Sequence, residues 1–217
     1  MILAGLDIAS TTGLAILDGD KAITATWKAP KRKGYVFGDD EKKNIDPLHS
    51  GQIGCSFEDY LRSWLVDNRV EYVAIEQPLR SDAKRKKTTV DTSSRFAGNA
   101  IKTEVVPITS MATIYRLYGL SFLALSVCAR FGIPARMVNQ SEWRKAFLGN
   151  GSPKDAKQAA VAQCKRLGIA FSSVDACEAI GVAWWLRGEL FPQRFAAADS
   201  LFNLPPTPDG RSATASG

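Results

Sequence analysis

The segment that most constrains the fold is ILAGLDI at residues 2–8, an apolar run of strand length that contains one carboxylate, Asp7. A second such run, VEYVAIEQP at residues 70–78, contains Glu76 and stops at Pro78. Strands that are apolar along their whole length are covered on both faces, so the two runs predict a sheet buried between helices. An unpaired carboxylate in such a strand costs several kcal/mol unless a partner neutralises it.

The remaining periodicities complete an α/β pattern. Alternating segments after the first strand predict a β-meander, with further strands at residues 14–18 and 21–29. Cap residues and apolar spacing predict a strand at 133–139 and helices at 56–68, about 110–131, 152–167 and 173–188. The order βββ-α-β-α-β-α-α predicts one central five-stranded mixed sheet, made of the β-meander plus two parallel strands and flanked by helices on both faces.

Three segments fall outside this pattern. Residues 30–54 predict a loop, and residues 79–109 predict a long basic loop insertion, of a length that is either functional or disordered in a compact domain. Residues 203–217 are rich in Pro, Ser and Gly and are expected to form a disordered tail. The chain of 217 residues is long enough for one domain, at 1–202, and not comfortably for two.

Composition disfavours several protein classes. Four cysteines without a C-x-x-C pair predict reduced thiols in a cytoplasmic protein. A single histidine, His49, excludes a site with several histidine ligands. The longest apolar stretch, residues 117–133, is interrupted by Ser121, Ser126 and Arg130 and is too short to cross a bilayer. The N-terminus lacks the basic lead of a signal peptide, so we expect no membrane partner.

The net charge is +6, and the basic residues are concentrated in two segments. Residues 80–102 contain seven Lys and Arg against two Asp, and residues 130–168 contain eight against two acids. This distribution predicts a surface that binds a polyanion, of which a nucleic-acid backbone is the expected example. The alternative is a set of solvated helix faces and a flexible loop.

The acidic residues of the apolar segments are expected to converge. If the strand of Glu76 runs parallel and adjacent to that of Asp7, both carboxylates point into the crevice at the strand ends. Asp175 and Glu178, in VDACEAIGVAWW, are three residues apart and project from one face of the last helix. No Lys or His lies in these segments to balance the four acids, so we expect them to bind two divalent cations. All-oxygen ligands favour Mg²⁺, for which Mn²⁺ substitutes.

Each of these acids also has a structural explanation when it is considered alone. Asp7 is equally consistent with a salt-bridged acid, and Glu76 with an ordinary strand end. Asp175 is favoured in a first helical turn by the helix dipole. Glu178 is harder to explain in this way because it lies on the same face as Asp175 among apolar neighbours.

Three motifs, LDIASTTGLAILD, VAIEQP and VDACEAIGVAWW, occur in an order that resembles the RuvC-type Holliday junction resolvases of the RNase H-like (retroviral integrase-like) superfamily. The resemblance covers about 190 residues and leaves out the tail. It implies that the catalytic metal ligands are Asp7, Glu76, Asp175 and Glu178. It also implies a homodimer that cuts four-way DNA junctions by two-metal hydrolysis, leaving 5′-phosphate and 3′-hydroxyl ends, without a nucleotide cofactor.

The same resemblance suggests DNA-binding residues. In the family, one or two basic residues ahead of the last helix contact the scissile phosphate, and the candidates here are Arg144, Lys145, Lys154 and Lys157. The basic loop adds residues that are interpreted either as DNA contacts or as solvated side chains, namely Lys84, Arg85, Lys86 and Lys87. Two features depart from the cellular enzymes. Glu178 stands where they have Asp, and the long basic loop is more similar to phage or prophage relatives.

Two other functions fit part of the sequence. LDIASTTG also resembles the first phosphate loop of actin-like (ASKHA) sugar or acetate kinases. Those kinases need two domains to close around ATP, and they have no use for the D-x-x-E pattern of the last helix. The other alternative is a catalytically silent module that binds branched DNA, against which the complete set of four acids argues.

Overall fold

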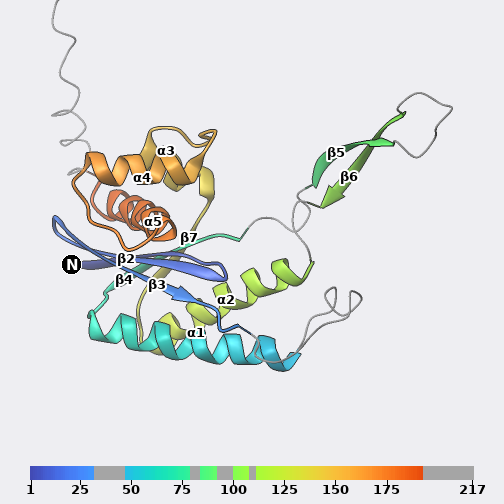
Figure 1. Ribbon diagram of the computed structural model, residues 1–217. Helices are drawn as coiled ribbons and strands as arrows, with labels where there is room; N and C mark the ends of the chain where they lie inside the picture. Colours follow the sequence, from blue (N-terminus) through green and yellow to red (C-terminus); the bar gives the residue numbers. More distant parts are fainter. Residues whose placement is uncertain (32–46, 79–83, 92–99, 108–110, 193–217) are drawn as a thin grey trace, which may run out of the picture.

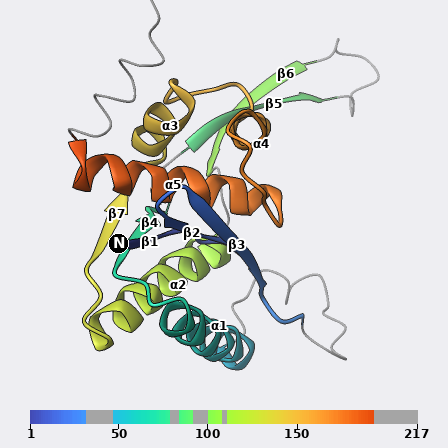
Figure 2. The ribbon, with the colours of Figure 1, turned by 90° about the vertical axis from the view of Figure 1, so that its left-hand side faces the viewer.

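The computed structural model describes residues 1–31, 47–78, 84–91, 100–107 and 111–192. Its centre is a mixed sheet that lies between two layers of helices, as Figures 1 and 2 show from two directions. The predicted α/β architecture with helices on both faces of one five-stranded sheet is therefore confirmed.

The sheet has the strand order β3-β2-β1-β4-β7. The antiparallel meander at the N-terminus consists of β1 (Ile2–Asp7), β2 (Thr11–Asp18) and β3 (Lys21–Lys28). The next strand, β4 (Tyr72–Glu76), pairs with β1 in parallel, and β7 (Ala135–Val138) pairs with β4 in parallel. The parallel pairing of β1 and β4 is the relationship on which the expected convergence of Asp7 and Glu76 depends.

The helices divide between the two faces of the sheet. One face is covered by α1 (Pro47–Asp67) and α2 (Met111–Arg130), whose apolar side chains form a core with β1, β2 and β4. The other face is covered by α5 (Val174–Leu190), with α3 (Gln140–Leu148) and α4 (Ala156–Arg166) packed against it. Helix α5 is buried from Ala176 to Ala183 because it lies between the sheet and these two shorter helices.

Two glycines allow α5 to lie directly on the strands. A Cβ atom at Gly5 of β1 would come within 2.2 Å of the carbonyl oxygen of Ala179, and one at Gly13 of β2 within 2.1 Å of that of Asp175. No side chain fits at such separations, so both positions require the absence of a Cβ. The glycines therefore fix how closely the N-terminal half of α5 approaches the sheet.

The predicted loop at 79–109 was wrong. The described parts of this segment form an antiparallel hairpin of β5 (Lys84–Asp91) and β6 (Ala100–Pro107), which extends away from the five-stranded sheet (Figure 1). The β-branched residues of KRKKTTVD and AIKTEVVP favour strands, but their many charges resemble those of a solvated loop. Antiparallel pairing in the hairpin satisfies the backbone without requiring an apolar pattern.

Several predicted helix ends were also wrong. Helix α1 begins at Pro47 and not at Ser56, because Pro suits a first helical turn and Ile53 is buried in the core. Helix α4 begins after Asp155, whose side chain caps it, and not at Ser152. Helix α5 continues through Gly188 to its end at Leu190.

Helix α3 was not predicted at all. Its buried residues are Trp143 and Phe147, and a single apolar spacing of this kind is too short a pattern to indicate a helix.

Among the predictions from composition, the four cysteines are free, as expected. The tail at 203–217 lies outside the described residues.

Among the described helices, one is long and apolar enough to cross a membrane by length and composition, at residues 112–130 of α2. This is weak evidence, because a core helix meets the same criteria. In this fold, Leu120, Ala124 and Val127 of α2 are buried in the core beside α1.

Candidate metal centre

Two of the four predicted acids lie at the same edge of the sheet. In the parallel pairing of β1 with β4, Leu6 lies opposite Ile75, and each strand ends at the next residue, Asp7 and Glu76. The carboxyl ends of adjacent parallel strands form the crevice in which α/β proteins place ligands. The fold therefore brings Asp7 and Glu76 to the location that the sequence predicted.

The other two acids are brought to this edge by the start of α5. Ser173 caps the helix by accepting a hydrogen bond from the Ala176 N–H to its Oγ, at 3.1 Å. The same Oγ lies 2.7 Å from Thr26 Oγ1 of β3, which links the helix start to the sheet. The first turns of α5 are thereby fixed over the strands, with Asp175 and Glu178 facing the ends of β1 and β4.

Three carboxylates meet closely. One oxygen each of Asp7, Asp175 and Glu178 can be chosen so that all lie within 4.8 Å of one another. Glu178 is only 5% exposed, and the other two are half-buried. Carboxylate oxygens are hard ligands that suit Mg²⁺ or Mn²⁺ and not the sulfur and nitrogen sites of zinc, so this donor set fits the predicted metal.

Glu76 lies beside this group and is held by other partners. The Gln140 Nε2 amide and the Trp143 Nε1–H, at 2.8 Å, donate hydrogen bonds to its two carboxylate oxygens. Neither donor was predicted from the sequence, because α3 itself was not. The Gln and Trp of NQSEW, directly after a strand parallel to that of Glu76, were the only available signal.

The electrostatics of the site favour neutralisation of the acids. Burial raises the pKa of Asp7 well above its usual range, and the nearby Glu76, Glu178 and Asp175 carboxylates raise it further. Burial also raises the pKa of Glu76 and of Glu178. A bound divalent cation favours the charged forms of these carboxylates, so their burial and mutual repulsion are the properties expected of a metal site.

Two basic side chains from other helices reach the carboxylates. Lys157 of α4 lies with its Nζ 2.6 Å from Asp175 Oδ1 and 3.6 Å from Glu178 Oε2. Arg144 of α3 lies 3.9 Å from Glu178 Oε1, with its guanidinium 5.3 Å from the centre of the Trp143 ring. The sequence predicted that no Lys or His balances the acids within the segments that carry them. Lys157 does so from a different helix, α4.

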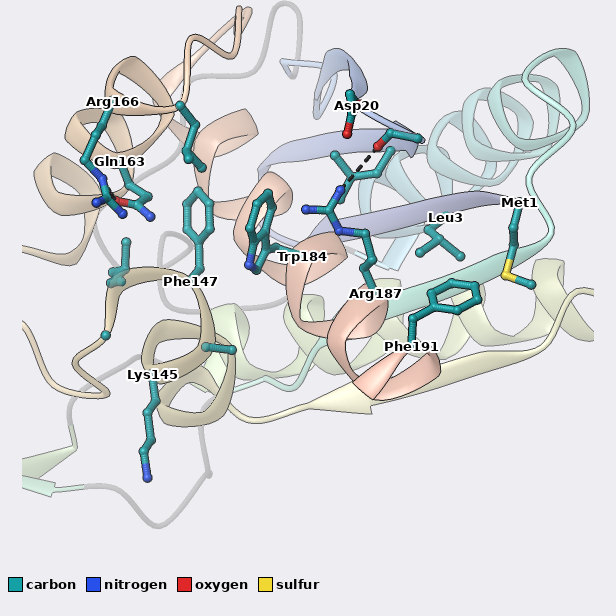
Figure 3. Close-up of a pocket in the computed structure, with 16 residues that line it drawn as sticks. Met1, Leu3, Asp20, Lys145, Phe147, Gln163, Arg166, Trp184, Arg187 and Phe191 are labelled. Atoms are coloured by element: carbon teal, nitrogen blue, oxygen red, sulfur yellow. Dashed lines mark hydrogen bonds between the residues drawn. The ribbon is translucent and has the colours of Figure 1, made fainter. Parts of the chain in front are cut away.

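The other predicted basic residues lie elsewhere or outside the description. Lys145 lines a cavity of about 830 Å³ with Phe147, Trp184 and Arg187, and none of the four acids lines that cavity (Figure 3). Lys154 is exposed in the turn before α4. The structure describes β5 without the side chains of its basic residues, so DNA contact there stays a prediction for Lys84, Arg85, Lys86 and Lys87.

Comparison with known proteins shows which fold this is. No protein-family model and no curated protein matches the chain. Among solved structures, RuvC of Thermus thermophilus matches with a TM-score of 0.53 and 15% identity, over 92% of this chain and 97% of that one. The same protein in complex with a Holliday junction substrate matches with a TM-score of 0.54 and 14% identity, over 92% and 96%.

The yeast mitochondrial Holliday junction resolvase is a further match, with a TM-score of 0.49 and 10% identity, over 92% of this chain and 83% of that one. At such identities the similarity to RuvC establishes the fold alone. The chain has the RuvC-like, RNase H-like fold that its three motifs predicted.

Proposed function

We propose that this protein is a metal-dependent, structure-selective endonuclease that resolves Holliday junctions or related branched DNA in the cytoplasm. The observation that carries the proposal is the close approach of Asp7, Asp175 and Glu178 at one edge of a RuvC-like sheet. Asp7 is distant in the sequence from Asp175 and Glu178, and a fold that needed these residues only as surface charges has no reason to bury them together.

The proposed metal ligands are Asp7, Glu76, Asp175 and Glu178, which hold two Mg²⁺ ions or the Mn²⁺ ions that substitute for them. Divalent ions held there would supply Lewis-acid activation for phosphodiester hydrolysis, which would leave 5′-phosphate and 3′-hydroxyl products. The four side chains would hold the ions, and the burial of Glu178 would limit access of bulk water on its side of the site.

The proposed phosphate contacts are the two basic residues at the cluster, Arg144 and Lys157. The Nε of Arg144 is buried and has no hydrogen-bond partner within the described structure. The Arg144 side chain as a whole is 19% exposed, so the outer nitrogens of its guanidinium, and not the buried Nε, can meet a phosphate oxygen as charged donors. Lys157 is 57% exposed at its side chain, so it can turn from Asp175 towards a bound strand.

The proposed substrate is branched DNA, chiefly the four-way junction that one of the similar RuvC structures contains. Support comes from the basic hairpin β5–β6, which carries Lys84, Arg85, Lys86 and Lys87 and extends from the body of the fold (Figure 1). Phosphate contacts by such residues supply affinity without reading sequence.

We extend the proposal to a homodimer, because resolution of a junction requires two cuts. Helix α2 supports this extension, since Tyr115 is 58% exposed and Phe122 is 69% exposed on it. These residues are seven apart and therefore lie on one face of the helix, where a second copy would cover them. Sedimentation velocity of the wild type and of a Tyr115→Glu, Phe122→Glu variant tests this, with a dimer expected only for the wild type.

A divalent-metal cleavage assay tests the main proposal. Labelled four-way junction, flap, replication fork and plain duplex are each incubated with the protein and Mg²⁺, and ATP turnover is measured in parallel. We expect cleavage of the junction or another branched substrate well above cleavage of the duplex, and no ATP turnover. ATP turnover without cleavage of any DNA would reverse the assignment in favour of the kinase alternative, and binding without cleavage would favour the silent module.

A further inference from the structure

Trp143 occupies an unusual place for a core tryptophan. Its side chain is fully buried, and it is one of the largest buried side chains of the described structure. Its only polar atom, the indole N–H, donates to Glu76 Oε2 at 2.8 Å. A buried indole N–H needs an acceptor in any case, and here that acceptor is a carboxylate at the edge of the sheet where the acids gather.

The ring of Trp143 also lies against the helix that carries the other acids. A Cβ atom at Gly181 of α5 would come within 2.6 Å of the Trp143 ring, so only glycine permits this contact. Gly181 follows Glu178 by three residues and lies close to one helical turn further along the same face. One side chain therefore holds the carboxylate at the end of β4 by a hydrogen bond and packs against the helix of Glu178.

Gln140 completes the arrangement from the preceding turn of α3. Its Nε2 donates to Glu76 Oε1, so each carboxylate oxygen of Glu76 accepts one hydrogen bond from α3. A carboxylate oxygen has a second lone pair available after accepting one bond. The two donors thus fix the plane of the carboxylate and leave an acceptor site on each oxygen for a cation.

We propose that Trp143, together with Gln140, is a positioning residue for Glu76 that sets the metal affinity of the centre. This inference rests on the metal centre proposed above. Neither residue contacts the reacting atoms; they act through Glu76, in the way that hydrogen-bond partners of metal ligands orient those ligands. The ligand that a carboxylate held in this way suits is a hard divalent cation, which prefers oxygen ligands.

The test is a Trp143→Phe variant, which keeps an aromatic ring against Gly181 and removes the N–H. The matched control is Trp64→Phe, since Trp64 is 9% exposed in the core on the opposite face of the sheet. Mn²⁺ binding to the full chain without DNA is measured by electron paramagnetic resonance, and the Mn²⁺ dependence of junction cleavage is measured in parallel. Thermal unfolding reports the loss of stability in both variants.

We expect Trp143→Phe to weaken Mn²⁺ binding about tenfold and to raise the Mn²⁺ concentration for half-maximal cleavage by a similar factor, with much of the rate restored at saturating metal. Trp64→Phe should lower the unfolding temperature without changing either metal measurement. Gln140→Leu, at a half-buried position, should weaken Mn²⁺ binding in the same direction and serves as the second variant if Trp143→Phe does not fold.

Metal binding that is unchanged in the variants that fold would overturn the inference, because Trp143 would then be a core residue only. The outcomes separate this inference from the proposed function. In one outcome, the wild type binds Mn²⁺ and cuts no DNA while the variants bind Mn²⁺ more weakly. In that case the proposed nuclease function is wrong and the positioning role of Trp143 stands. If the wild type binds no Mn²⁺, both are wrong.

Discussion

The Nζ atom of Lys157 lies 2.6 Å from Asp175 Oδ1 and also faces Glu178, at 3.6 Å. A cation of the protein itself therefore lies at the edge of the acid cluster. The contact to Asp175, followed by the charge of Glu178, raises the pKa of Lys157, so this residue remains charged at neutral pH. The lysine and a divalent ion then compete for the same carboxylate oxygens.

This competition predicts opposite effects of Lys157→Gln on binding and on cleavage. Removing the lysine should strengthen Mn²⁺ binding without DNA, at pH 8, by about two- to fivefold, which corresponds to the small free energy of an exposed ion pair. Cleavage should fall, because the proposed phosphate contact is lost. Calorimetric titration measures the first effect, with Lys165→Gln on the same helix as the control. Weaker Mn²⁺ binding in Lys157→Gln would contradict the competition.

Asp7→Asn should separate stability from function. The pKa of Asp7 is raised by burial and by three other carboxylates, which means that its charged form destabilises the metal-free fold at neutral pH. The neutral amide should therefore raise the free energy of unfolding by about 1 kcal/mol and abolish cleavage, a trade-off common at strained sites. Urea unfolding in EDTA measures the gain. A loss of stability would show that the Asp7 charge is satisfied within the protein.

The same shifts predict how the stability of the metal-free protein depends on pH. For Asp7, Glu76 and Glu178, the folded pKa is raised above the unfolded value, so the folded state binds more protons. Their contribution to stability is fully present below the ordinary carboxyl pKa of about 4 and is lost as the pH rises through the raised values. Thermal unfolding in EDTA should show this loss of stability with rising pH, and the loss should be smaller in Asp7→Asn. Mg²⁺ in place of EDTA should lessen the loss in the wild type only.

How much the sequence predicted depends on whether a residue's partners lie nearby in the chain or far away. Asp7 and Glu76 were assigned to one edge because strand ends and parallel pairing follow from local apolar patterns. The contacts of Trp143 and Lys157 follow from how α3 and α4 pack on α5, which no local pattern reports. The hairpin β5–β6 was missed because the four consecutive basic residues at the start of β5 resemble a solvated loop.

Glu76→Gln and Asp175→Asn should abolish nicking and preserve binding of the junction. Each substitution removes one charge from the proposed metal ligands and leaves every basic residue in place, so cleavage should fall more than about 100-fold while the dissociation constant in EDTA does not rise. Gel-shift and cleavage assays on the same four-way junction measure both. Loss of binding by a folded variant would mean that these acids have another role. Glu71→Gln, at an exposed residue before β4, is the control.

Charge reversal on β5 tests whether the hairpin binds DNA. Changing Lys84, Arg85, Lys86 and Lys87 to Glu should weaken junction binding and flatten its dependence on salt. Each phosphate contact that is lost lowers the slope of log K against log salt by about 0.9. Binding is measured across a series of NaCl concentrations, with Lys21→Glu on β3 as the control for a change of surface charge. An unchanged slope would place the hairpin away from the phosphates, and the contacts with DNA would then lie at Arg144 and Lys157, where the acids cluster.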